Sequence, residues 1–152
     1  KKATLPYEMW SMDKIKPDTN ALKNWLKKFN RGHYVVSGKL DGISALYCTE
    51  GSEPKLYTRG NGKVGQDISH AIKYLNLPDT ENITIRGELI MKKTTFNKNW
   101  SKKFANCRNM IAGTANAKEA FPQRWKDIDF VVDLPDTGHV LRCHAYSLPF
   151  RI

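Results

Sequence analysis

Residues 43–65 read ISALYCTEGSEPKLYTRGNGKVG, and the order of apolar, turn and glycine residues in this stretch decides the fold class. Residues 43–49 and 55–58 are rich in β-forming side chains, and the segment between them, which contains Gly51 and Pro54, is typical of a turn. The sequence therefore predicts an antiparallel hairpin. A loop punctuated by glycines follows the second strand of this hairpin.

This loop matches the pattern G-x-G-x-x-G from Gly60 to Gly65, which also occurs where a strand turns into a helix to bind a dinucleotide. In that alternative Glu88 would take the place of the ribose-binding acid, and the chain would be an oxidoreductase of the Rossmann class. We reject this interpretation because the strand before the loop is expected to pair back as a hairpin. Asn61-Gly62 is also a turn signal rather than the start of a helix.

The segments around the hairpin predict an α+β fold with largely antiparallel sheets flanked by helices, in a single domain over residues 1–152. Apolar residues at helical spacing indicate a helix that begins after an N-cap at Asp18-Thr19 and is stopped by Arg31-Gly32. The other expected elements are a strand at 34–36, a helix at 68–75, a strand at 83–91 interrupted at 86–88, a helix capped by Thr94 or Thr95, a helix at 108–116, and strands at 128–132 and 140–146.

Composition limits the possible partners and compartments. The chain has 152 residues, 40% of them hydrophobic, and a formal net charge of +10. Such a chain is too apolar for a disordered tail, and its basic excess favours a polyanion such as nucleic acid or a phosphorylated ligand. No apolar run is long enough to span a membrane. The three cysteines are scattered, which suggests an intracellular, reducing compartment.

Four charged segments are candidates for chemistry. In Lys39-Leu40-Asp41-Gly42 the lysine is placed to be a nucleophile and the aspartate to orient it or to hold a metal ion, although a surface lysine before a turn has the same pattern. Arg59, beside the glycine loop, suits a phosphate or ribose contact. Arg86 and Glu88 share one face of a strand, either as a cross-strand ion pair or as the lining of a site. Arg108, at a helix start, is placed to meet a phosphate.

The order of these segments resembles the adenylation domain of NAD-dependent DNA ligases, over about residues 5 to 132. The threonine-arginine-glycine loop, with its downstream glycine and aspartate, favours the NAD-dependent class over the ATP-dependent class. The motifs that carry the resemblance are residues 11–14 (SMDK), 39–45 (KLDGISA), 58–69 (TRGNGKVGQDIS), 85–89 (IRGEL) and 104–113 (FANCRNMIAG).

The resemblance implies a nucleotidyltransferase fold and a lysyl-AMP intermediate formed from NAD. AMP is then passed to the 5′-phosphate of nicked double-stranded DNA so that the nick is sealed. It implies that Lys39 is the nucleophile and that Asp41 supports it. Glu88 is implied to bind the cofactor by holding the ribose, or to help organise the site, and Mg²⁺ is implied to be held by Asp41 and Glu88. The remaining implied roles are cofactor contacts by Ser11, Met12, Leu40 and Arg59, and a DNA contact by Arg108.

Departures from the family pattern keep an alternative open. Ser37 stands where an acidic residue is usual and Asn116 where many members carry an arginine, and the later family motifs do not appear. The alternative is a catalytically impaired ligase-like fragment that binds nicked DNA only. We expect a monomer that represents part of an adenylation domain, with a divergent or truncated tail at 133–152.

Overall fold

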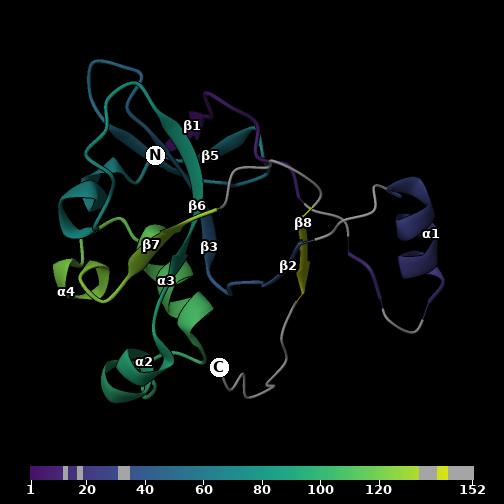
Figure 1. Cartoon of the computed structure of the whole chain (residues 1–152). Coiled ribbons are helices and arrows are strands. Elements are labelled where there is room, and N and C mark those ends of the chain that lie inside the picture. The colour runs from purple at the N-terminus through teal and green to yellow at the C-terminus, as the bar shows by residue number, and fades with distance from the viewer. Residues whose placement is uncertain (12–13, 17–18, 31–34, 134–139, 144–152) are drawn as a thin grey trace. The chain divides into compact units, whose positions relative to one another are not determined.

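The computed structural model describes residues 1–11, 14–16, 19–30, 35–133 and 140–143, the segments 35–37 and 140–143 by their backbone alone. The chain divides into two units. The first contains Lys1–Trp10 and Asp41–Asp133, and the second contains Ser11–Leu40 and Leu134–Ile152. Figure 1 shows the elements of each unit.

The first unit holds the hairpin and most of the secondary structure. Its largest sheet has four strands in the order β4-β3-β6-β7, and every neighbouring pair is antiparallel. A separate antiparallel pair joins β1 and β5. The elements in chain order are β1 (Lys2–Thr4), β3 (Ile43–Cys48), β4 (Lys55–Thr58), β5 (Val64–Gln66), the 3₁₀ helix η1 (Ser69–Tyr74), β6 (Thr84–Ile90), α2 (Lys93–Asn99), α3 (Cys107–Ala115), α4 (Pro122–Trp125) and β7 (Asp129–Val132).

The glycine loop connects two strands, β4 and β5. This agrees with the prediction that it is not a dinucleotide-binding turn, which would lead from a strand into a helix. β3 and β4 pair antiparallel with Ala45 opposite Thr58, and the loop leads into β5 rather than into a helix. Gly60 and Gly62 have φ values of 55° and 98°, which glycine adopts at little cost. Both the predicted hairpin and the α+β class are therefore confirmed, whereas β5 and β1 were not predicted.

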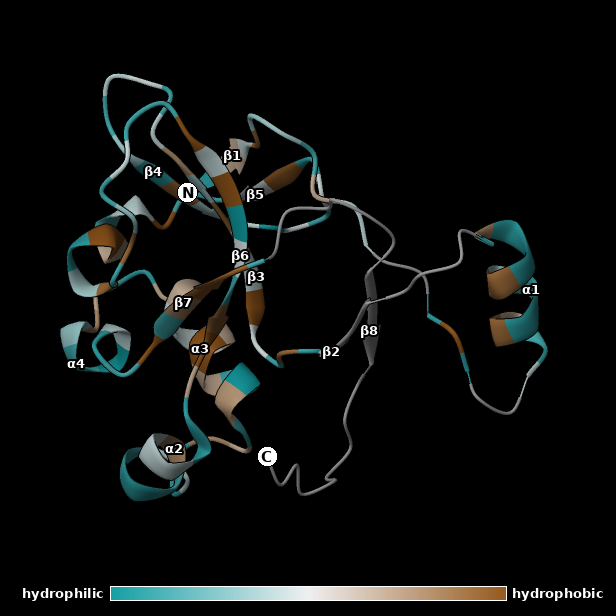
Figure 2. Cartoon of the chain, viewed as in Figure 1, coloured by the Kyte–Doolittle hydropathy of each residue, from teal (hydrophilic) through white to brown (hydrophobic). Residues whose placement is uncertain are grey.

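The four-stranded sheet is covered on both faces near β3. Ala45, Tyr47 and Leu89 face the main core, which also contains the fully buried Trp125. Leu46 faces a second, smaller cluster with Leu5 and Met9. A strand buried on both faces has a nearly continuous apolar sequence, which explains why β3 shows no alternation of apolar and polar residues. Figure 2 shows apolar residues along β3 and α3.

Several predicted boundaries need correction. β6 runs from Thr84 to Ile90 without a break, because residues 86–88 all pair with β3. Glycine suits position 87, since a Cβ there would approach the Phe130 ring to 2.5 Å. Residues 69–74 form a 3₁₀ helix within the helix expected at 68–75.

The expected threonine cap of α2 is wrong, because Lys92 occupies the N-cap and makes no side-chain cap hydrogen bond. By contrast, α3 is capped by Asn106, whose side chain accepts a hydrogen bond from the Asn109 amide at 2.8 Å.

The second unit contains α1 (Ala21–Lys28) and a parallel pair of short strands, β2 (Val35–Gly38) and β8 (Val140–Cys143). The predicted helix is present. Asn20 rather than Thr19 is at its N-cap, while the Thr19 hydroxyl accepts a hydrogen bond from the Ala21 amide at 3.2 Å. Asp18 lies outside the described residues, and so do residues 134–139 and 144–152 of the tail. The single domain and the monomer stay predictions.

Candidate functional site

Residues 41–44 connect three of the segments that the sequence singled out. They lead from Leu40 into β3, and each of three other motifs reaches them through a hydrogen bond or an ion pair. Gly42 is buried here, and a Cβ at this position would overlap the carbonyl oxygen of Leu89 on the neighbouring strand. The start of β3 therefore lies so close to β6 that only glycine fits at position 42.

Arg108 joins the N-terminal turn of α3 to this segment. Its guanidinium donates to the Gly42 carbonyl oxygen at 2.6 Å and lies 3.3 Å from the Asp41 carboxylate. Both side chains of the ion pair are exposed, Arg108 by 48% and Asp41 by 65%. Because water and a ligand reach both groups, this contact is open to exchange with an anion.

Glu88 is fixed much more firmly than Asp41. Its exposed fraction is 8%, and its carboxylate accepts a hydrogen bond from the Ser44 hydroxyl at 2.7 Å across the β3–β6 pair. A buried carboxylate is costly without such a partner. The strand register therefore holds Glu88 beside the start of β3, on the sheet face opposite the main core.

Arg59 is joined to the same segment through the backbone, since its amide donates to the Ser44 carbonyl oxygen at 2.9 Å. The loop that follows Arg59 is braced by Asn61, whose side-chain oxygen accepts hydrogen bonds from the Lys63 and Val64 amides at 3.0 and 2.8 Å. Further along, burial raises the pKa of Asp67, but hydrogen bonds from the Ser69 hydroxyl and amide outweigh it, so that the pKa lies below 3.8.

Arg86 resolves the choice between an ion pair and a site lining. Its Nε lies 3.3 Å from the carboxylate of Asp133, just beyond β7, and its guanidinium donates to the Trp10 carbonyl oxygen at 3.2 Å. Arg86 is thus a structural contact between β6, the end of β7 and the N-terminal segment. Glu88, its neighbour on the same face, is the member of the pair that stays available for a site.

The structure brings Asp41, Glu88, Arg59 and Arg108 together in the first unit, all around residues 41–44. Lys39 belongs to the second unit, directly after β2, and the chain joins it to Asp41 through Leu40. Leu40 is 39% exposed and Lys39 is half-buried. Ser11 also lies in the second unit, and Met12 lies outside the described residues.

Asp41 and Glu88 supply the carboxylates that this site could offer to a divalent cation. Among the described residues there is no group of three or more His, Cys, Asp or Glu side chains that could hold a metal ion. Mg²⁺ commonly takes only one or two protein carboxylates and completes its shell with water and substrate phosphates. The carboxylates of Asp41 and Glu88 fit that mode, because each keeps acceptor positions beyond its single protein partner.

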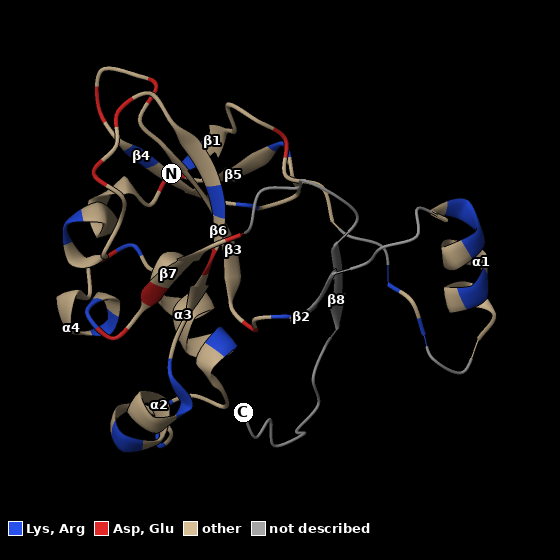
Figure 3. Cartoon of the chain, viewed as in Figure 1, with Lys and Arg blue, Asp and Glu red and all other residues tan. Residues whose placement is uncertain are grey.

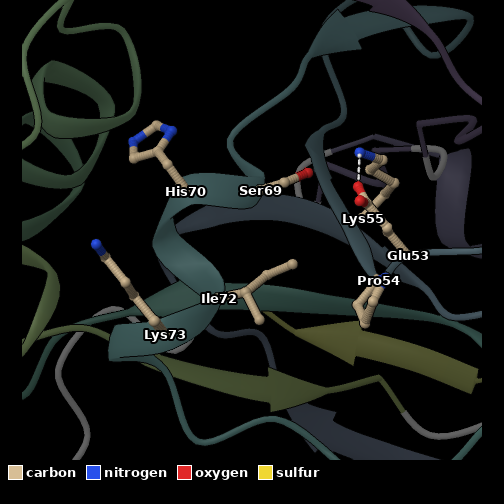
Figure 4. A pocket seen from close by; sticks show the side chains of 7 residues that line it. All are labelled: Glu53, Pro54, Lys55, Ser69, His70, Ile72 and Lys73. Atoms are coloured by element: carbon tan, nitrogen blue, oxygen red, sulfur yellow. Dashed lines mark hydrogen bonds and ion pairs between the residues drawn. The ribbon is translucent and has the colours of Figure 1, made fainter.

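A shallow pocket elsewhere in the first unit does not include any of these residues. Figure 4 shows that it lies between the start of β4 and η1, where Lys55 forms an ion pair of 3.2 Å with Glu53. It is lined by Glu53, Pro54, Lys55, Ser69, His70, Ile72 and Lys73. The candidate site is therefore the surface around residues 41–44 and not this pocket.

Sequence reasoning missed two contributions. Ser44 was read only as part of a motif, although its hydroxyl holds Glu88. Asp133 was assigned to the divergent tail, although it pairs with Arg86. The close backbone approach at Gly42, by contrast, was expected from the sequence, because a glycine at the start of an otherwise apolar strand signals such an approach.

Comparisons with known proteins find DNA ligases among the relatives of this chain. The chain is 46% identical over 124 residues to a DNA ligase of Acanthamoeba polyphaga mimivirus, a match that covers 78% of this chain and 19% of the relative. It is 44% identical over 122 residues to a putative DNA ligase of Invertebrate iridescent virus 6, with the same coverage. It is 36% identical over 110 residues to a DNA ligase of Mycoplasma genitalium, covering 63% of this chain and 17% of the relative.

The chain thus spans about a fifth of the length of the first of these relatives. Among the described residues, no helix has the length and apolar character needed to cross a membrane. A family model described as the NAD-dependent DNA ligase adenylation domain matches residues 1–132, which contain Lys39 and the whole contact network around residues 41–44. The chain therefore belongs to the family of NAD-dependent DNA ligase adenylation domains.

Proposed function

We propose that this chain carries out the nucleotidyl-transfer chemistry of an NAD-dependent DNA ligase, with Lys39 as the nucleophile. The observation that carries the proposal is the set of contacts on residues 41–44, directly after Lys39. The segment carries the exposed Asp41 carboxylate, and the Arg108 guanidinium contacts it. The buried Glu88 carboxylate and the backbone amide of Arg59 both bond to Ser44. Such a set suits the binding and activation of a phosphate diester or anhydride.

In the proposed first step, the neutral Lys39 amine attacks the α-phosphorus of NAD. A phosphorus–nitrogen bond forms, the bond between this phosphorus and the bridging oxygen breaks, and nicotinamide mononucleotide leaves with the bonding electrons. The amine proton passes to solvent or to a neighbouring carboxylate. The product is a phosphoramidate that links AMP to Lys39.

In the following steps a 5′-phosphate oxygen at a DNA nick attacks the same phosphorus and releases Lys39. The 3′-hydroxyl of the nick then attacks the 5′-phosphorus and expels AMP, which closes the phosphodiester. Phosphoryl transfer depends mainly on positioning and on neutralising charge. Arg108 is suited to the nick phosphate, because its present partner, Asp41, is exposed and replaceable.

The other residues have binding or positioning roles in the proposal. Glu88, held by Ser44, offers a fixed acceptor for a ribose hydroxyl. Arg59 contacts the nucleotide from the glycine loop, and Ser11, Met12 and Leu40 contact the adenosine. Mg²⁺, if held by Asp41 and Glu88 together with substrate phosphates, would supply neutralisation of the phosphate charge.

The test is an intact-mass measurement after incubation of the chain with NAD and Mg²⁺. We expect an adduct with the mass of an AMP group, absent in Lys39→Ala and retained in Lys55→Ala, whose lysine lies in the shallow pocket away from the site. Release of the adduct by nicked duplex DNA would support the second step. Absence of any adduct, in the chain and in a longer protein that contains it, would rule the proposal out.

A second candidate function is binding of nicked DNA without catalysis. It is favoured by Ser37 and Asn116, which stand where the family pattern usually has an acidic residue and an arginine. It predicts that nicked duplex DNA binds at low salt whether or not NAD is present, and that no adduct forms. The mass measurement and a binding titration together separate the two functions.

A further inference from the structure

Positive charge is distributed very unevenly along this chain. Residues 89–118 carry seven cationic side chains and no acidic one, whereas the other 122 residues carry 18 cationic and 15 acidic side chains. One fifth of the chain therefore holds +7 of the net charge of +10. The seven side chains are Lys92, Lys93, Lys98, Lys102, Lys103, Arg108 and Lys118.

These seven side chains are all exposed, and we call them the basic surface. They lie on α2, on the turn that follows it, and on both ends of α3, as Figure 3 shows for the two helices. The opposite sides of the same elements are buried: Phe96 on α2, and Met110 and Ile111 on α3, belong to the main core. The packing of these apolar residues thus directs the cations outward.

The lysines of this surface are not neutralised by neighbours. Within the described part of the chain, Arg108 is the member of the surface that forms an ion pair, with Asp41. The other ion pairs there involve Lys55, Lys63 and Arg86 instead. Lysines that face water without an acidic partner keep their full charge for an external anion.

The basic surface is continuous with the candidate site. Arg108, one of the seven side chains, is also the partner of Asp41 in the site, at a distance of 3.3 Å. Arg108 lies in the N-terminal turn of α3, so the basic surface reaches the candidate site at that end of the helix.

We propose that the basic surface binds the phosphate backbone of duplex DNA flanking the nick, beyond the contact made by Arg108. The inference rests on the proposed function, since it assigns a surface to the DNA of that reaction. DNA is the occupant that the charge favours: NAD has only two phosphates, whereas a duplex presents a regular row of them. Contacts of this kind are independent of base sequence and weaken steeply with salt.

The test compares two triple variants of the 152-residue chain with the same change in charge. Lys93→Gln, Lys98→Gln and Lys102→Gln remove three cations from the basic surface. Lys23→Gln, Lys27→Gln and Lys28→Gln remove three exposed cations from α1, in the other unit. Binding of a nicked duplex is measured by titration over a range of salt concentrations, after far-UV circular dichroism shows that each variant is folded.

We expect the first variant to bind on the order of 10- to 100-fold more weakly near 0.1 M salt. The slope of log affinity against log salt should become shallower by about 2.7, corresponding to three lost phosphate contacts. The α1 variant should change both quantities much less. Equal losses in the two variants would show that DNA responds only to overall charge, and an unchanged slope in the first variant would show that these lysines do not touch it. Either result overturns the inference.

Adduct formation with NAD in the absence of DNA separates this inference from the proposed function. The proposed reaction with NAD gives no role to Lys93, Lys98 or Lys102. The first variant should therefore form the AMP adduct as the unmodified chain does. If no protein forms the adduct but the first variant still loses DNA binding, the proposed function fails and the basic surface stands. If the adduct forms and the two variants bind DNA equally well, the proposed function stands and the inference about the basic surface fails.

Discussion

Two acidic side chains in the same contact network are held in opposite ways. Glu88 is 8% exposed and hydrogen-bonded to Ser44 across two paired strands. Asp41 is 65% exposed and paired with Arg108, itself 48% exposed, where water competes for both partners. The first arrangement is part of the folded sheet, whereas the second is a surface contact whose net contribution to stability is typically below about 1 kcal/mol.

The difference teaches which part of the site is rigid and which part is available. A binding site benefits from one fixed group that positions the ligand and from another that exchanges its partner when the ligand arrives. In the proposed function Glu88 meets the first need, because it is buried and its carboxylate is held by the Ser44 hydroxyl. Arg108 and Asp41 meet the second, because a phosphate can replace Asp41 at the guanidinium without disturbing the core.

The largest effect is expected from filling the space between β3 and β6, the rigid side of the comparison. In Gly42→Ala the new Cβ would overlap the Leu89 carbonyl oxygen, so the strands must separate. We expect a loss of about 3 kcal/mol in the free energy of unfolding, measured by urea denaturation. Gly51→Ala is the control, because its Cβ would meet no atom closer than 4.0 Å. Equal stability of the two variants would contradict the close packing of Gly42 against the Leu89 carbonyl oxygen.

A smaller effect is expected from removing the partner of Glu88. In Ser44→Ala the buried carboxylate loses its 2.7 Å hydrogen bond. The free energy of unfolding, measured by urea denaturation, should therefore fall by about 1–3 kcal/mol. The same variant should form the AMP adduct more slowly if Glu88 must be held in place. Ser52→Ala, in the exposed turn between β3 and β4, is the control. If neither the free energy of unfolding nor the rate of adduct formation changes, Glu88 is not fixed by this hydrogen bond.

The exposed pair should contribute less to stability than to function. We expect Asp41→Asn to change the free energy of unfolding by less than about 1 kcal/mol, because the pair is screened by water. A double-mutant cycle with Arg108→Gln should give a coupling energy of roughly 0.2–1 kcal/mol. Adduct formation, in contrast, should fall strongly in Asp41→Asn. A coupling energy as large as the effect of Ser44→Ala would remove the distinction between the two acids.

The smallest effect concerns Asp67, which is intermediate in exposure between Glu88 and Asp41. Its pKa in the folded chain lies below 3.8, so its ionised form stabilises the fold. This contribution is fully present well above the ordinary aspartate pKa of about 3.9 and is lost as the pH falls through the lowered pKa. The stability difference between the unmodified chain and Asp67→Asn should therefore shrink as the pH falls below about 4.

Urea denaturation at several pH values tests this dependence. The exposed Asp79, replaced by asparagine, is the control. A difference between the unmodified chain and Asp67→Asn that grows on acidification would show that the sign is wrong.

Most of the fold and much of the site were accessible from the sequence because they depend on local patterns. The hairpin follows from two β-rich segments around a turn, and α3 follows from Arg108 to Asn116 with its apolar spacing. Ser44 and Asp133 were missed because their roles depend on which strand lies beside which. A serine inside an apolar strand carries no signal of its own until the register places Glu88 opposite it.

The sequence by itself determined the fold class, the order of the family motifs and the identity of the charged groups, because residue type, spacing and order are properties of the chain. Tertiary structure alone decided that Arg86 pairs with Asp133 while Glu88 is buried beside Ser44, although these two charged residues share one strand face. It also decided that the cations of residues 89–118 all face water. The physical reason is that burial and pairing depend on neighbours from distant segments, which only the packed strands and helices bring together.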